Sequence, residues 1–245
     1  MSYKTIKKRF DNDSYTTGEI TTLSRAINII FDATYFEKKE GLLLFRSEGK
    51  NIYWRKIQSE SKREIESWFE NLDQICSWWY LSFTIDGKRW VRQLLEKKYI
   101  WIPVQHCLFH QKKTVLNYTT RKPKTECWKS IKHIVEKLLL EDDRTLRVKI
   151  LVCEIIFKDF LKEKNEKGEY THKRLRSALR SLKVNLPYLF TYKKYPLLQI
   201  ENTTNSCDGY FSHLKSKIQI HRWLRNDRKW KMIHYLLTQD SNSIS

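Results

Sequence analysis

Two aspartates stand at places in the sequence where a carboxylate needs an explanation. Asp32 lies inside an apolar run, between Phe31 and Ala33, where an ionised carboxylate is costly to bury unless it is paired or binds a metal. Asp86 follows the apolar run 81–85 and precedes Gly87, and ligand sites of α/β proteins gather where strands end. The alternatives are a solvated carboxylate at Asp32 and an ordinary Asp-Gly turn at Asp86. The repetition of the pattern favours a shared role in chemistry, such as metal binding.

A third carboxylate comes from the segment 201–215, which opens a helix. If Asn205 is its N-cap, an apolar stripe faces a core and Asp208 shares another face with Lys215 and Arg222. One interpretation is a metal-binding acid followed by bases that contact phosphates. The other is a capping-box acid near the positive end of the helix dipole. The apolar stripe consists of Cys207, Phe211, Leu214 and Ile218.

The charge of the chain points to a polyanionic partner. The 47 Lys and Arg residues exceed the 28 Asp and Glu residues, which gives a net charge of +19. Phosphate neutralisation rewards dispersed positive charge, so we expect nucleic acid as the partner rather than an anionic membrane surface. No apolar run approaches the ~18 residues that cross a bilayer. The start of the sequence lacks the apolar segment of a signal peptide. The five cysteines are widely spaced, which suits free thiols rather than a disulfide framework. We therefore expect a soluble, intracellular protein.

The elements that must position these acids can be predicted from hydrophobic patterning. Runs 26–36, 42–46 and 52–57 predict three strands joined by short turns, hence an antiparallel meander. A helix over 61–76, capped by Ser61, a strand over 78–86, a helix over 88–98 and a strand over 101–109 predict parallel pairing. Helices follow at 127–140, 146–161 and 174–182. This order is that of a ribonuclease H-like α/β fold, a mixed five-stranded sheet with flanking helices and an all-helical insertion before the last catalytic helix.

Four motifs together resemble bacterial insertion-sequence transposases of the Mutator-like group. They are Ile30-Phe-Asp-Ala-Thr-Tyr-Phe36, Ile85-Asp-Gly-Lys-Arg-Trp90, Val104-Gln-His-Cys-Leu-Phe-His110 and the segment from Asn202 to Lys215. In this order and spacing the resemblance covers most of the chain. It implies an acidic triad at Asp32, Asp86 and Asp208, with Glu201 as a rival for the third position because many relatives have Glu in this helix.

The resemblance also implies the surroundings of the triad. It places a Cys-x-x-His pair at Cys107 and His110, for which we expect packing or hydrogen bonding beside the active site, with Asn205 as further support. Cys127 and His133 invite a zinc interpretation, but structural zinc sites use four ligands at more regular spacing. We expect Mg²⁺, with Mn²⁺ as a substitute, held by the three acids, and we do not expect zinc.

By resemblance, the protein cleaves transposon ends and transfers the 3′-ends to target DNA. Expected partners are double-stranded DNA and further copies of the chain, as a homodimer or higher oligomer, in a bacterial cytoplasm near the nucleoid. The implied domains are a remnant of a DNA-binding helix-turn-helix (1–22), the first catalytic part (23–110), a helical insertion (111–197) and the closing helices (198–245). The expected phosphate contacts of the insertion and last helices are Arg174, Arg176, Arg180, Lys183, Lys215 and Arg222.

The front of the chain departs from the family, whose members begin with a zinc-binding segment and a helix-turn-helix. Residues 2–10 look like only the tail of a recognition helix. Two alternatives to a catalytic transposase therefore stay open. One is a truncated transposase derivative that binds DNA without catalysis, and the other is a ribonuclease H-like nuclease that cuts without joining.

Overall fold

The computed structural model describes residues 26–37, 40–75, 80–119, 124–221 and 223–240, together with Thr5 and Lys8. Two compact units divide the chain: Met1–Tyr80 with Asn205–Ser245 form unit 1, and Leu81–Thr204 form unit 2. Each unit combines strands with helices, so the α/β class is confirmed. Arg222 and nearly all of the predicted helix-turn-helix remnant at 1–22 lie outside the described residues.

Unit 1 is built on the predicted antiparallel meander. Strands β1 (Ile27–Glu37), β2 (Glu40–Ser47) and β3 (Lys50–Ile57) pair in sequence, with Asp32 opposite Leu44 and Leu44 opposite Trp54. Glu48 and Gly49 join β2 to β3 with positive φ angles of 49° and 77°. Two positive φ angles suit the twist of a short hairpin turn. The three strands were all predicted from apolar runs separated by short polar turns.

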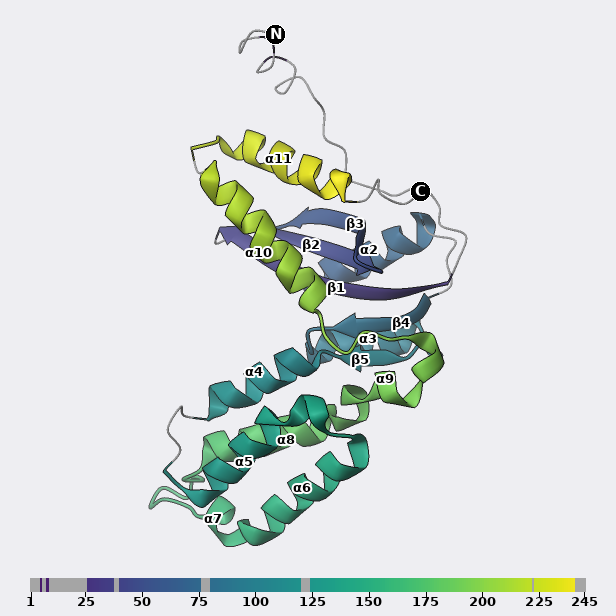
Figure 1. Ribbon diagram of the computed structural model, residues 1–245. Helices are drawn as coiled ribbons and strands as arrows, with labels where there is room; N and C mark the ends of the chain where they lie inside the picture. The colour runs from purple at the N-terminus through teal and green to yellow at the C-terminus, as the bar shows by residue number, and fades with distance from the viewer. Residues whose placement is uncertain are drawn as a thin grey trace. The chain divides into compact units, whose positions relative to one another are not determined.

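Helices cover both faces of this meander (Figure 1). On one face lies α2 (Lys62–Ile75), whose Phe69 ring packs against Phe31 and Phe45 at centroid distances of 5.3 and 5.4 Å. As predicted, Ser61 caps α2 by accepting a hydrogen bond from the Glu64 amide. On the other face lie α10 (Asn205–Ile220) and α11 (Asn226–Gln239). Their buried cluster with the sheet contains Ile30, Leu42, Leu44, Trp54, Cys207, Phe211, Leu214, Ile218, Trp230, Ile233 and Leu237.

Glu40 ties the far end of this meander to α11. Its carboxylate accepts hydrogen bonds from Lys56 Nζ at 2.7 Å, Trp230 Nε1 at 2.9 Å and Asn226 Nδ2 at 2.6 Å. Burial alone would raise the pKa of Glu40, but these three donors outweigh it and lower the pKa to about 2. The end of unit 1 is therefore held by a charged group as well as by apolar packing.

Unit 2 begins with the parallel pair that the sequence predicted. Strand β4 (Tyr80–Ile85) leads through α3 (Arg89–Lys98) to β5 (Val104–His106), and Phe83 pairs with Val104 in parallel. The predicted strand 101–109 was wrong at both ends. Trp101 is 91% exposed, and Cys107 already caps α4 (Leu108–Tyr118). The reason is helical spacing: Leu108, Gln111 and Val115 form the buried face of α4.

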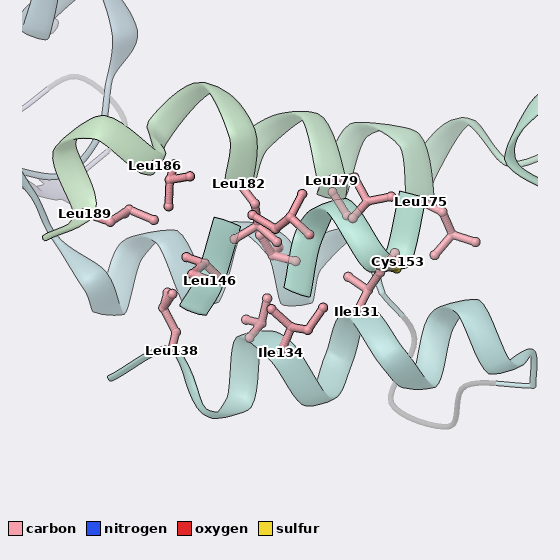
Figure 2. Packing of buried hydrophobic residues seen from close by; sticks show 14 of the residues in the cluster. Ile131, Ile134, Leu138, Leu146, Cys153, Leu175, Leu179, Leu182, Leu186 and Leu189 are labelled. Carbon is pink, nitrogen blue, oxygen red and sulfur yellow. The ribbon is translucent and has the colours of Figure 1, made fainter. Parts of the chain in front are cut away.

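A helical core fills the rest of unit 2. It contains α5 (Glu126–Glu136), the 3₁₀ turn η1 (Leu138–Leu140), α6 (Asp143–Ile156), α7 (Lys158–Lys162), α8 (Lys173–Leu189), α9 (Thr191–Lys194) and η2 (Pro196–Leu198). Figure 2 shows the leucine and isoleucine side chains that interlock between these helices, including Ile131, Leu146 and Leu182. The helix predicted over 146–161 is split at Phe157. None of the helices within the described ranges is long and apolar enough to cross a bilayer.

Candidate metal and nucleic-acid site

Two of the three predicted acids meet inside unit 1. Alternation along β1 puts Asp32 on the same face as Ile30, which is the face that α10 covers. Asp208 lies in the first turn of α10, one residue after the fully buried Cys207. As a result, a carboxylate oxygen of Asp32 and one of Asp208 lie within 4.8 Å of each other. Residues from the two ends of the unit thus build one acidic pair.

The pair is held by its local backbone. Asp32 is half-buried, and its Oδ1 accepts a hydrogen bond from the Ala33 amide at 2.8 Å. Asp208 is also half-buried, and the packing of Cys207, Phe211 and Leu214 into the core fixes the helix that carries it. Two carboxylates this close repel unless a cation or a proton lies between them. Hard oxygen donors at this spacing suit a divalent cation such as Mg²⁺, with little movement needed.

Asp86 lies in unit 2, directly after β4. Its Oδ1 accepts a hydrogen bond from the Lys88 amide at 3.2 Å, and its Oδ2 lies 3.5 Å from Lys88 Nζ. Gly87 follows with a φ of +95°, and a Cβ there would lie 2.0 Å from Nε2 of His106. Only glycine fits both this backbone conformation and this close approach. The turn that presents Asp86 therefore rests on the neighbouring strand.

His106 is a neutral support beneath that turn. It is 3% exposed, and its Nδ1 has no hydrogen-bond partner among the described residues. Burial, followed by the positive charge of Arg92 and the proximity of His110, lowers its pKa to about 3. Sequence reasoning named Asp86 but missed His106. The signal was available, because a histidine inside the strand-forming run Val-Gln-His has no solvent to face.

The Cys-x-x-His pair and the predicted rival Glu201 lie together in unit 2. Cys107 caps α4, and its sulfur accepts hydrogen bonds from the Thr204 amide at 3.2 Å and the His110 amide at 3.5 Å. His110 Nδ1 lies 3.1 Å from Thr204 Oγ1. The Glu201 carbonyl accepts a hydrogen bond from Thr84 Oγ1 at 2.8 Å, so residue 201 is bonded to β4 through its main chain.

Three of the predicted phosphate contacts line one groove of unit 2. This groove, of about 510 Å³ between α6 and α8, contains Arg176, Arg180 and Lys183, with Lys173 and Tyr170 beside them. The Arg176 guanidinium stacks on the Tyr170 ring at 3.7 Å. Lys183 is bonded to Glu154 at 2.9 Å, which offsets part of its charge. The groove offers several cations on one helix face, a pattern suited to a phosphate backbone.

The remaining predicted residues are more dispersed. Arg174 points away from that groove and donates to the Asn117 carbonyl at 2.6 Å. Lys215 is exposed on α10, and Asn205 is the first residue of α10 rather than a residue before it. Arg222 lies beyond the residues that can be placed. The four described cysteines, Cys107, Cys127, Cys153 and Cys207, are free thiols and buried.

The sequence was also compared with known protein families and curated proteins. No model of a protein family matches the sequence, and no curated protein matches it.

Proposed function

We propose that this chain is a metal-dependent DNA phosphodiester transferase, the catalytic core of a cut-and-paste transposase. The observation that carries the proposal is the approach of Asp32 and Asp208 to within 4.8 Å in a protein with a net charge of +19. Two half-buried carboxylates at this distance repel each other less when a cation lies between them, and a basic surface recruits a phosphate polymer. The motif resemblance points to the same chemistry.

Asp86 is proposed as the third acid because the motif resemblance implies it and because the turn directly after β4 presents its carboxylate. Asp208 is preferred over Glu201 because it is fixed on a helix and already faces Asp32. Glu201 remains the residue to test as its rival.

The chemistry divides between the acids and the basic groove. Divalent cations bound to the acids would supply charge neutralisation at a phosphodiester and activation of an attacking oxygen, of water or of a 3′-hydroxyl. Asp32, Asp86 and Asp208 would bind and orient these ions. Arg176, Arg180 and Lys183 would hold flanking phosphates in register without reading sequence.

The direct test measures cleavage and joining by the purified chain. Duplex oligonucleotides copied from the DNA on either side of its gene are incubated with Mn²⁺ and supercoiled plasmid. Loss of a metal ligand removes several kcal/mol of transition-state stabilisation. We therefore expect Asp32→Asn, Asp86→Asn and Asp208→Asn each to lower the yield of joined product about 10³-fold. Glu201→Gln is expected to stay within a factor of about ten of the wild type.

The matched control is Asp159→Asn, an exposed acid on α7 of unit 2. It removes the same charge and should leave the yield unchanged. Cleavage without joined product would favour a nuclease. DNA binding with neither cleavage nor Mn²⁺ binding would favour a non-catalytic derivative, and either result contradicts the transposase proposal.

A further inference from the structure

Helix α6 of unit 2 has two apolar faces. Its inner face is buried in the helical core, and Figure 2 shows Leu146 and Cys153 of this face among the leucines of α8. Its outer face carries large apolar side chains that are between 45% and 66% exposed. These side chains, here called the stripe, are Val148, Leu151, Val152, Ile155 and Ile156.

The stripe is one continuous side of the helix. Counted from Val148, it continues three, four, seven and eight residues further on, which are neighbouring positions on one side of an α-helix. The opposite side of α6 makes the packing contacts within unit 2. Half-exposed side chains of this size amount to on the order of several hundred Å² of apolar surface, and patches of that size mark interaction sites.

The spacing of the stripe is the same in both directions. Val148 and Ile155 lie equally far from a midpoint between Leu151 and Val152. A second α6 that runs antiparallel would therefore place the partner's Ile155 against Val148 and the partner's Val152 against Leu151. A two-fold interface requires a patch that is complementary to itself in this way.

The charges beside the stripe match the same arrangement. Arg147 and Glu154 lie two turns apart on one flank of α6, on either side of nearly the same midpoint. A two-fold axis across antiparallel helices brings equal flanks together, so Arg147 would approach the partner's Glu154 twice. Each also has an ionic partner in its own chain, Asp143 and Lys183 respectively, but guanidinium and carboxylate groups form several hydrogen bonds at once.

We propose that the stripe is a self-association surface, through which two copies of the chain pack α6 against α6, antiparallel about a two-fold axis near Leu151 and Val152. Copies with a net charge of +19 repel each other, so their contact requires a face of uncharged side chains. A standard dimer buries about 800 Å² on each partner, and the stripe supplies about half of that, so we expect modest affinity.

The inference does not depend on the proposed metal site. The motif resemblance implied further copies of the chain without a surface for them. The stripe adds the surface, the direction of the two helices and their register.

Sedimentation equilibrium of the full chain, without DNA or metal, tests the surface at concentrations up to roughly 100 μM. We expect a monomer–dimer equilibrium. Ile155→Glu should weaken it at least tenfold, because the dimer would have to bury a carboxylate at two places. The matched control is Ile100→Glu, which changes an isoleucine that is 73% exposed in the connection between α3 and β5, and it should leave the equilibrium unchanged. If Ile155→Glu does not fold, Ile155→Ala replaces it and should weaken association less.

Salt separates apolar association from bridging by bound nucleic acid. Association through the stripe should hold or tighten as salt rises, because salt screens the repulsion between two positive copies. Bridging by nucleic acid would weaken instead, since phosphate contacts are lost at high salt.

Disulfide trapping tests the direction and register of the pair. In the antiparallel arrangement, position 148 of one copy lies beside position 155 of the other, whereas the two positions 148 lie seven residues, or about 10 Å, apart along the helices. A mixture of Val148→Cys and Ile155→Cys chains should therefore form a cross-linked dimer on mild oxidation. Val148→Cys alone should form no more of it than the wild type, whose four described cysteines are buried.

A wild type that stays monomeric would overturn the proposal, whether another segment of the chain or an anionic lipid vesicle is then found to cover the stripe. Equal effects of Ile155→Glu and Ile100→Glu, or association that dissolves as salt rises, would overturn it as well. Efficient cross-linking of Val148→Cys to itself would refute the antiparallel pair. Because these experiments contain neither DNA nor metal, their failure would leave the proposed function standing.

Discussion

The fold strongly controls the charge state of His106. Its ring is buried beneath the Gly87 turn, and burial together with the charges of Arg92 and His110 disfavours its protonated form. With a pKa of about 3 in the folded chain and about 6.5 in the unfolded chain, it takes up a proton only on unfolding across the interval between these values. The unfolded state binds more protons there, so stability must fall as the pH falls.

This sets a pH dependence for the free energy of unfolding. Between pH 8 and pH 5, protonation of one such histidine in the unfolded state costs about 2 kcal/mol of stability. In His106→Gln the change in stability over this interval should be smaller by about that amount, whatever the stability at pH 8. Urea unfolding at a series of pH values measures it. His133→Gln, at an exposed position on α5, should retain the wild-type dependence of the free energy of unfolding on pH. The same pH dependence in His106→Gln and His133→Gln would refute the assignment to His106.

Single residues also mark what the sequence could and could not reveal. Asp32 and Asp208 could be predicted, because an acid in an apolar strand and an acid at a helix start are visible locally, and their proximity follows from the alternation of β1. The burial of His106 had a local signal, but its contact with the Gly87 turn did not, because another element brings Gly87 to it. The hydrogen bond from the Thr204 amide to Cys107 likewise depends on a neighbour from another element.

The turn between β4 and α3 is the element with the least tolerance for change. It combines the left-handed φ of Gly87 with direct contact between its backbone and the ring of His106 on β5. Any side chain at position 87 must displace that ring or distort the turn that presents Asp86. The connection is therefore set by sterics as well as by turn propensity.

Gly87→Ala should cost about 3 kcal/mol or more, because conformational strain and a steric clash add. Gly168→Ala isolates the first contribution, since Gly168 has a φ of +74° with nothing within 4 Å of the added Cβ. It should cost only about 1–2 kcal/mol. Chemical unfolding of the two variants gives the comparison. Equal losses would mean that His106 moves aside freely.

Elements were predictable where local pattern and tertiary packing agree. The three strands of the meander are apolar runs rich in β-branched and aromatic residues, and each was found at the expected place. The fifth strand was overextended, because Trp101 and Ile102 look strand-like although the pairing with β4 begins only at Val104. The break of a predicted long helix at Phe157 has no proline or glycine to announce it, since it follows from how α6 and α7 pack in unit 2.

At the scale of the whole molecule, charge dominates behaviour. A net charge of +19 produces a positive field that would draw the proposed DNA partner from a distance, and the groove with Arg176, Arg180 and Lys183 concentrates part of that charge on one face of unit 2. Affinity for duplex DNA should therefore fall steeply with salt. The slope counts the phosphates that the protein neutralises.

Arg180→Ala tests the place of the groove in this binding. Removing one phosphate contact should reduce the slope of log affinity against log salt by about 1, similarly on any DNA sequence. Fluorescence anisotropy of a labelled duplex between roughly 50 and 200 mM salt measures the slope. Lys97→Ala, on the exposed side of α3, removes an equal charge and should leave the slope unchanged. A larger effect of Lys97→Ala would place the DNA elsewhere.

Unit 1 is assembled from the beginning and the end of the chain, whereas unit 2 is one continuous stretch between them. On the ribosome, the strands β1 to β3 emerge early but wait for α10 and α11 to cover their apolar face, while the middle stretch can fold as soon as it is released. Asp32 consequently meets Asp208 only after the whole of the intervening stretch 81–204 has been synthesised. A nascent chain cannot assemble that carboxylate pair before the covering helices exist, so the proposed DNA-cutting activity would be confined to chains synthesised beyond those helices.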